Sequence, residues 1–478
     1  MNAPCTAISA APTIEISDGI SSASFNGLPG GILCEDLPVM QRQLLAWYSH
    51  AKRDLEWRRT RDPYCIWLSE IMLQQTRVAA VIPYYRRFLA RFPTVQHLAN
   101  ARIDSVLRYW SGLGYYSRAR NLHQAAKQIV ACHNGKFPQD PAEALELAGI
   151  GSYTAAAVLS ISYHAPLAVL DGNVARVLAR LTAVRDDLRQ PAVWRGLTDA
   201  AQTLLHTAAP GDWNQAMMEL GATLCTPRAP HCAECPISRW CRARALGIAE
   251  SVPAPRRKPA TVHIVLAAAV LLDRRGRTLL VRYPQLKRPG RRRGEHAHDH
   301  QHDENSPSLF SRLWQFPSLA GPMPENVAPR RPAMSKKPTA RTTATTRAGD
   351  AARNAPSKRR PPVFQPESGG LADLARRLSA HLAHSFGISP PQLTALPTSQ
   401  HGVTFRNIRL APFLARVDQL PSLAGARTPH LAKVERLPIS NATRKIIATV
   451  RQSLENPGIA SCTLPVSRRR RRAAKKPR

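Results

Sequence analysis

The sequence predicts a multidomain protein in which an all-α domain is followed by an α+β domain. Its 478 residues are enough for two to four domains with at least one full hydrophobic core. Between about residues 37 and 245, apolar residues recur at helical spacing with few alternating β-branched stretches. Near residue 262 the pattern changes: 262–272, a turn at 273–276 and 278–282 predict a β-hairpin.

The first half divides into an extension, a helical domain and a cysteine-rich loop. Residues 1–35 are rich in Ala, Ser, Gly and Ile without a period, so we expect a disordered N-terminal extension. Helical spacing begins near Leu37, which predicts a helical domain over 36–222. The cysteine-rich loop is expected over 223–245, with a linker over 246–261.

The second half is expected to hold one α+β domain over 262–455. Two low-complexity stretches, near 287–306 and 322–366, are expected to be disordered insertions in it. Helical spacing predicts a helix over 371–384, and a strand-like pattern covers 403–417. The remaining residues, 456–478, form a basic tail that we also expect to be disordered.

The charge indicates a polyanionic partner. The formal net charge is +35, and residues 251–478 alone carry 42 Lys and Arg against 12 Asp and Glu. Such an excess favours nucleic acid, although much of it lies in segments that are not expected to fold and so does not identify a reaction. We expect no membrane-spanning helix, because no run of eighteen apolar residues occurs. Nine cysteines and the absence of a signal-peptide pattern favour a reducing intracellular compartment.

Four of the nine cysteines form a cluster with gaps of six, two and five residues. They are Cys225, Cys232, Cys235 and Cys241. A set of thiolates selects a [4Fe–4S] cluster or zinc over hard cations. The alternatives to a cluster are a structural zinc site and unligated core cysteines.

A turn between two predicted helices carries paired glycines, Gly149 and Gly151. Such a turn can direct backbone N–H groups outward at the start of a helix, where they bind phosphate. A single Gly-x-Gly is also a common turn, so the pattern alone does not distinguish these readings.

Two carboxylates lie in contrasting sequence environments. Glu70 lies within the apolar run 66–73, where desolvation would favour its neutral, proton-donating form. Asp171 precedes Gly172 and Asn173 at a predicted helix start, where amide donors favour an anion. The plain alternatives are a solvated helix face for Glu70 and a simple helix N-cap for Asp171.

Several segments together resemble the helix-hairpin-helix glycosylases of the endonuclease III superfamily and, within it, the MutY family of adenine DNA glycosylases. The resemblance is close over about 37–245 and faint over 262–450. One small departure is Ala148, which stands where the family motif has proline. The matching segments are 67–78, 112–122, 147–155, 170–178, 214–221 and the four-cysteine loop.

The resemblance implies an all-α helix-hairpin-helix glycosylase domain with a [4Fe–4S] loop, followed by an α+β Nudix-like domain. It assigns Glu70 as general acid and then water activator, and Asp171 as stabiliser of the positively charged sugar. Tyr153 and Asn173 become catalytic helpers, with plain packing as the alternative for Tyr153. Tyr153 also stands where bifunctional relatives carry a nucleophilic lysine, so the resemblance implies a monofunctional enzyme.

The resemblance further implies contacts to duplex DNA that contains adenine opposite 8-oxoguanine or guanine. Gln74 and Tyr115 match positions that wedge into the base stack, and the alternative for both is an ordinary helix-surface or core position. Thr404 and Phe405 match the loop that reads 8-oxoguanine, with Phe405 in place of the usual histidine. We expect the protein to act as a monomer.

Two other functions stay open at this point. A bifunctional glycosylase/lyase would need an amine at the position of Tyr153. A noncatalytic DNA-binding or redox-signalling protein would retain the scaffold and cysteine cluster without the chemistry, which the presence of both Glu70 and Asp171 opposes.

Overall fold

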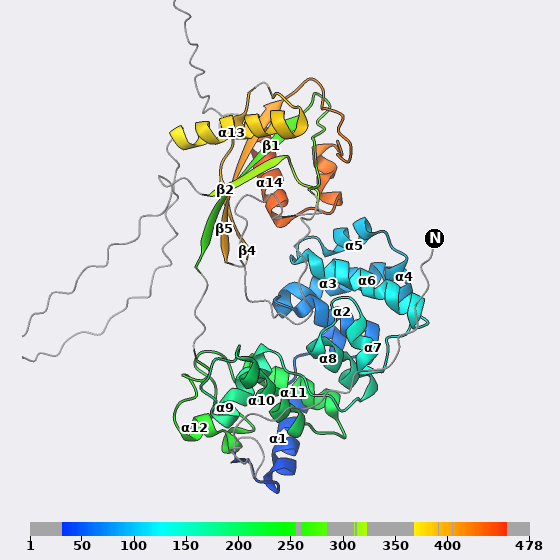
Figure 1. Cartoon of the computed structure of the whole chain (residues 1–478), viewed down its shortest axis with the longest axis vertical. Coiled ribbons are helices and arrows are strands. Elements are labelled where there is room, and N and C mark those ends of the chain that lie inside the picture. Colours follow the sequence, from blue (N-terminus) through cyan, green and yellow to red (C-terminus); the bar gives the residue numbers. More distant parts are fainter. Residues whose placement is uncertain are drawn as a thin grey trace, which may run out of the picture. The chain divides into compact units, whose positions relative to one another are not determined.

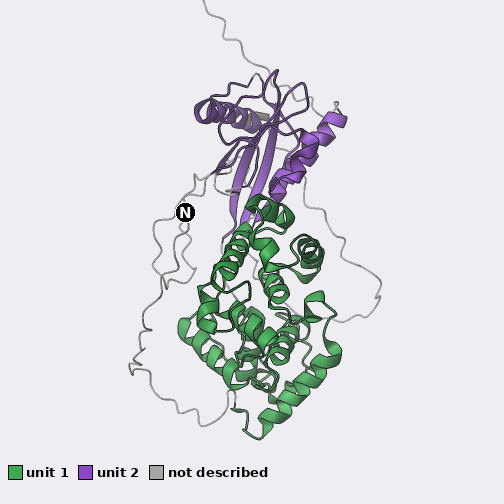
Figure 2. Cartoon of the chain, turned by 90° about the vertical axis from the view of Figure 1, so that its right-hand side faces the viewer, with its two compact units in different colours: residues 1–258 green, residues 259–478 purple. Residues whose placement is uncertain are grey.

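The computed structural model describes residues 31–254, 260–283, 310, 313–322, 368–390, 392–403 and 405–456. The chain divides into two compact units, residues 1–258 and 259–478 (Figure 2). Most of the expected N-terminal extension, both expected insertions, Thr404 and the basic tail from residue 457 lie outside the described residues.

The first unit is helical throughout its described residues, as the sequence predicts (Figure 1). Two short 3-10 helices, η2 (Glu56–Arg58) and η3 (Ser238–Trp240), accompany the α-helices. The α-helices are α1 (Asp36–Ala51), α2 (Pro63–Leu73), α3 (Val78–Arg91), α4 (Val95–Ala99), α5 (Ile103–Trp110), α6 (Tyr116–Cys132), α7 (Pro141–Glu146), α8 (Ser152–Tyr163), α9 (Gly172–Thr182), α10 (Pro191–Thr203), α11 (Pro210–Thr223) and α12 (Arg242–Ala245).

Helix α2 lies in the core of this unit and packs against α3, α6 and α8. It begins where the Asp62 side chain accepts a hydrogen bond from the Tyr64 N–H, with Pro63 in the first helical position. Eight of its eleven residues are buried, which is the pattern of a helix that is apolar on every side. Any ionisable side chain on α2 is therefore placed in apolar surroundings.

A second group of helices, α1, α9, α10 and α11, shares one hydrophobic core. Leu44 of α1, Leu178 of α9 and Leu220 of α11 are completely buried in it. Ile32 belongs to the same core, so the folded part begins slightly before residue 36, within the expected extension. None of the helices among the described residues has the length and apolar character needed to cross a membrane.

The second unit is a mixed sheet between two helices. The strand order is β2 (Ser318–Pro322), β1 (Val262–Leu272), β5 (Arg406–Arg416) and β3 (Thr394–Ala395), and β4 (Ser399–Val403) also pairs with β5. Strands β1 and β5 are parallel, with Val262 opposite Arg406, and the other pairs are antiparallel.

Helices cover both faces of this sheet. Leu266 and Val270 of β1 share a core with Ile447 of α14 (Asn441–Glu455). Val265, which directly precedes Leu266, lies on the other face of the sheet. There it shares a core with Leu382 of α13 (Ser368–Phe386) (Figure 1). The unit also contains the 3-10 helix η6 (Leu431–Arg436). Burial on both faces explains why β1 is apolar throughout 264–272.

The predicted hairpin is wrong beyond its turn. The turn forms, with the Gly276 N–H donating to the Asp273 carbonyl, and Thr278 makes one isolated bridge to Leu272. The chain then leaves β1: Leu280 bridges to Arg427 and Val281 to Gln315. The physical reason is that β2 and β5 already occupy the two edges of β1.

Candidate active site

Helix α2 places Glu70 in a desolvated position. Its side chain lies among the buried residues of the helix, and Glu70 is only 6% exposed. Burial raises the pKa of Glu70 to about 7, against a hydrogen bond from Tyr153 that lowers it. The nearby Asp171 carboxylate also raises this pKa. A glutamic acid that holds its proton near neutral pH can serve as a general acid.

Tyr153 of α8 contacts the carboxyl group of Glu70 directly. The Tyr153 hydroxyl donates to Glu70 Oε2 at 2.6 Å. Burial, together with the charges of Glu70 and Asp171, raises the pKa of Tyr153 well above its usual range, so the phenol remains a donor. Tyr153, whose hydroxyl also lies 3.2 Å from Met218 Sδ, therefore holds the Glu70 carboxyl group in one orientation.

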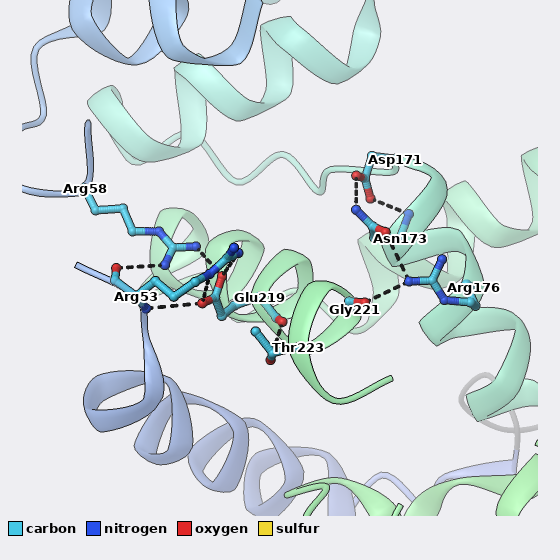
Figure 3. A network of polar contacts seen from close by, with 8 residues as sticks. All are labelled: Arg53, Arg58, Asp171, Asn173, Arg176, Glu219, Gly221 and Thr223. Carbon is cyan, nitrogen blue, oxygen red and sulfur yellow. Dashed lines mark hydrogen bonds and ion pairs between the residues drawn. The ribbon is translucent and has the colours of Figure 1, made fainter. Parts of the chain in front are cut away.

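Asp171 forms the N-cap of α9 (Figure 3). Its Oδ1 accepts from the backbone N–H groups of Asn173, at 2.9 Å, and Val174, at 2.7 Å. Its Oδ2 accepts from Asn173 Nδ2 at 3.1 Å. The plain N-cap reading is thus correct as a description of structure. It does not exclude a second role, because the cap fixes the carboxylate in one orientation.

Glu70 and Asp171 line the same cavity, although they are far apart in the sequence. The cavity has a volume of about 670 Å³. Tyr153, Asn173 and Gln74 also line it. The arrangement brings a buried carboxyl group with a raised pKa and a capped carboxylate to one space that is large enough for a small-molecule ligand. The catalytic roles of these residues stay predictions.

A third carboxylate at the cavity was not singled out from the sequence. Glu219 of α11 is 0% exposed and accepts from Arg53 Nε at 2.7 Å, Arg53 Nη2 at 2.6 Å and Arg58 Nη2 at 2.7 Å (Figure 3). Burial raises the pKa of Glu219, but the hydrogen bonds and charges of the two arginines outweigh it and lower the pKa to about 2. All three residues line the cavity, so it contains a fixed anion between two cations.

One local signal could have identified Glu219. It lies within the apolar stretch 216–220, where an acid must find a partner if it is buried. Its partners Arg53 and Arg58 precede it by more than 160 residues, and no local pattern connects them.

The remaining predicted residues of the helical unit lie outside the cavity lining. Tyr115 is 41% exposed and has a left-handed backbone, with φ 46°. Gly151 is the N-cap of α8, and Gly149 has φ 78°. A Cβ atom on Gly149 would meet the Asn121 Cβ at 2.6 Å, so this turn requires glycine both for its φ and for its close packing.

In the second unit, Phe405 precedes β5 and is partly buried. Its carbonyl accepts from the Val262 N–H at 2.9 Å, and the Arg406 guanidinium lies 5.6 Å from the centre of its ring. Nothing in these contacts assigns a ligand to Phe405.

The four predicted cysteine ligands line one small cavity beside the end of α9. Arg180 Nη1 donates to Cys225 Sγ at 3.2 Å, and burial raises the pKa of the Cys235 thiol to about 12. In the part of the chain that the structure describes, no group of three or more His, Cys, Asp or Glu side chains is placed to hold a metal ion. All four thiols nevertheless line one space, and an all-thiol donor set suits an iron–sulfur cluster or a zinc ion.

Helix α9 connects the cysteine loop to the capped carboxylate. Arg176 Nε donates to the Cys225 carbonyl at 2.9 Å. Arg176 Nη2 donates to Asn173 Oδ1 at 3.1 Å and to the Gly221 carbonyl at 2.8 Å (Figure 3). Asn173 in turn contacts Asp171, so one chain of hydrogen bonds joins the two regions.

Comparison with known proteins finds relatives of the helical unit. Residues 68–195 match the HhH-GPD superfamily of base excision DNA repair proteins. The adenine DNA glycosylase of Rattus norvegicus is 47% identical over 218 residues, which are 44% of this chain and 42% of the relative. The helical unit is thus similar to the adenine DNA glycosylases of this superfamily over the matched residues.

Two further relatives extend the match. The adenine DNA glycosylase of Homo sapiens is 46% identical over 219 residues, covering 44% of this chain and 40% of the relative. That of Arabidopsis thaliana is 35% identical over 331 residues, covering 61% of this chain and 49% of the relative. This chain thus spans less than half the length of each of these curated relatives.

Proposed function

We propose that this chain is a monofunctional adenine DNA glycosylase, which hydrolyses the N-glycosidic bond of adenine opposite 8-oxoguanine or guanine in duplex DNA. The observation that carries the proposal is the pair of carboxyl groups at one cavity: buried Glu70, with its raised pKa, and Asp171, fixed at the start of α9. The names of the relatives support adenine as the base that is released.

The chemistry follows from the environments of these groups. Adenine is a poor leaving group, so Glu70 donates a proton to N7 as the glycosidic bond breaks. The sugar then develops positive charge, which the Asp171 carboxylate stabilises. The deprotonated Glu70 can next activate the attacking water, while Tyr153 holds Glu70 Oε2 throughout. The Glu219 carboxylate and the guanidinium groups of Arg53 and Arg58 supply the other fixed polar groups that a purine meets in the cavity.

A lyase step is not part of this proposal. The step would need an amine to attack the sugar and form a Schiff base. No lysine lines the cavity among the described residues, and the Tyr153 hydroxyl is already bound to Glu70. Borohydride should therefore trap no covalent protein–DNA adduct, and a trapped adduct would favour the bifunctional alternative.

The cysteine loop is proposed to hold a [4Fe–4S] cluster through Cys225, Cys232, Cys235 and Cys241. Such a cluster, when bound, holds a loop in shape through four metal–thiolate bonds. The loop carries Arg239, Arg242 and Arg244, whose positive charges suit contacts with DNA phosphates.

Loss of one ligand should remove the cluster and weaken DNA binding. For Cys235→Ser, we expect loss of iron and acid-labile sulfide and weaker duplex binding, because the basic loop is no longer held in place. Metal analysis and absorption spectra of the purified protein measure the first effect, and a binding titration measures the second. Cys132→Ser, at an exposed cysteine outside the loop, is the control. Stoichiometric zinc in the unaltered protein would contradict the cluster.

The second unit is proposed to be a Nudix-like domain that reads the base opposite the adenine, through Thr404 and Phe405. Its mixed sheet between two helices is compatible with this role. The match to the Arabidopsis relative supports this role further. It covers 61% of the 478 residues, which is more than the 258 residues of the first unit, so it extends into the second unit.

Single-turnover excision on three duplexes tests the whole proposal. Adenine is placed opposite 8-oxoguanine, guanine or cytosine, and release of the base is followed with enzyme in excess. We expect fast release opposite 8-oxoguanine, slower release opposite guanine and little opposite cytosine. Absence of release from all three would overturn the proposed activity, whereas equal rates would overturn the proposed role of the second unit.

The excision rate should fall as the pH rises through about 7. Glu70 must be protonated to act as the acid, and its pKa is raised to about 7 by burial, so the active fraction is high below that pH and is lost above it. Single-turnover rates across this range measure the midpoint. A midpoint near the ordinary pKa of an exposed glutamic acid would contradict the assignment of Glu70.

A further inference from the structure

Arg118 of α6 occupies an unusual position for a cation. It is 9% exposed, and its guanidinium donates through Nη1 to three backbone carbonyls, those of Ile71 at 2.6 Å, Met72 at 2.8 Å and Gln74 at 2.7 Å. Its Nη2 donates to Thr76 Oγ1 at 3.1 Å. One side chain of α6 thus binds the last turn of α2 and the residues that follow it.

The bound carbonyls explain how a buried arginine is stabilised without an acid. The last carbonyl groups of a helix lack partners within the helix and carry its negative dipole end. Helix α2 ends at Leu73, so Arg118 meets this end directly. Among the described residues no carboxylate forms an ion pair with Arg118. Removal of the guanidinium would therefore leave several carbonyls unpaired at once.

Arg118 also contacts a second segment, the 114–116 turn, in which Gly114 and Tyr115 lead into the first residue of α6. Its Nη2 lies 3.4 Å from the Gly114 carbonyl, and the guanidinium lies 5.4 Å from the centre of the Tyr115 ring. The 74–77 loop and the 114–116 turn, separated in sequence by about forty residues, therefore share one side chain as their common contact.

Both segments contain a non-glycine residue with left-handed backbone. Gln75 has φ 55° and Tyr115 has φ 46°. Such conformations persist only where the surroundings hold them. Both side chains are exposed, and the 74–77 loop also lines the cavity that contains Glu70. Arg118 thus contacts two segments with an exposed left-handed residue, and one of them, the 74–77 loop, lines the cavity of the proposed reaction.

We infer that Arg118 is a positioning residue, which fixes the 74–77 loop and the 114–116 turn as one rigid unit that enters the base stack when adenine is extruded. The inference rests on the proposed glycosylase function. It assigns Arg118 to the extrusion of the base and not to proton transfer, because its contacts are with these two segments and not with Glu70 or Asp171.

The experiment compares two duplexes that differ in the free energy needed to extrude the adenine from the base stack. One contains adenine opposite 8-oxoguanine in a fully paired duplex, and the other has mismatched pairs on both sides of the adenine, so that unstacking is easier. For Arg118→Met we expect a loss of about 100-fold in single-turnover rate on the paired duplex and a much smaller loss on the mismatched one. The pH midpoint should match that of the unaltered protein on both.

Lys127→Met is the matched control, because Lys127 is an exposed cation on the same helix. It should leave both rates unchanged. A 2-aminopurine beside the adenine gives a second readout, since its fluorescence rises when the neighbouring base leaves the stack. In Arg118→Met this rise in fluorescence should be slower than in the unaltered protein. The rise reports extrusion itself, because it comes before the glycosidic bond breaks.

Three results would overturn the inference. They are unchanged rates for Arg118→Met, an equal loss on both duplexes, and a displaced pH midpoint. If Arg118→Met does not fold, Thr76→Val tests the inference instead, because it removes one hydrogen-bond acceptor of Arg118. Its loss of single-turnover rate should be smaller and again confined to the paired duplex. An unaltered protein that releases no adenine from any duplex would instead overturn the proposed function, which separates the two failures.

Discussion

Glu70→Gln should reduce adenine release by about 10³-fold or more, while leaving the fold intact. Glutamine has the same shape and can still accept the hydrogen bond from Tyr153 through its amide oxygen, but it cannot donate an acidic proton. The residual rate should also lose its dependence on pH near 7, because Glu70 is the group that titrates there. Single-turnover excision across pH measures both effects.

Two controls make this result specific. Glu146→Gln alters an exposed acid at the end of α7 and should not change the rate. Duplex binding by Glu70→Gln should match that of the unaltered protein, since the change removes no charge that contacts DNA in the proposal. Undiminished base release from Glu70→Gln would disprove the role of Glu70 as the acid.

Asp171→Asn should reduce base release by about 10²-fold or more with little change in stability. Asparagine is as good an N-cap as aspartate, so α9 should keep its first turn. The negative charge that faces the developing positive sugar is lost. Asp171→Ala, in contrast, should lose both the activity and about 1 kcal/mol of stability, because it removes the cap as well. Thermal unfolding and single-turnover rates, measured together, separate the two functions.

Asp140 supplies the comparison for Asp171. It caps α7 by accepting from the Ala142 and Glu143 N–H groups and does not line the cavity. Asp140→Ala should lower stability by a similar amount without affecting the chemistry. If Asp171→Asn kept full activity, the simple N-cap would be the whole role of Asp171.

Local patterns were sufficient to predict the helical unit. The apolar run of α2 and the Asp-Gly-Asn start of α9 both indicate elements whose position follows from burial and capping. The prediction of a hairpin after β1 failed because strands that are distant in sequence compete to pair with β1. Residues 278–282 have suitable propensity, but β2 and β5, which are far away in sequence, take the edges of β1.

The same distinction holds at the candidate site. The environments of Glu70 and Asp171 could be predicted because their neighbours in sequence create them. The contacts of Glu219 and Arg118 could not, because their partners come from other helices or loops and depend on the final packing. A buried charge can be suspected from an apolar context, but its partner is a property of the tertiary structure.

The parallel pairing of β1 with β5 affects the order in which the protein can fold during synthesis. Every residue of the helical unit has been translated by residue 258, whereas the central strand pair of the second unit must wait until residue 416. Contacts between such distant segments form slowly, and the first unit of a chain generally folds first. A ribosome paused between these points would thus carry a finished helical unit and a sheet that still lacks its centre.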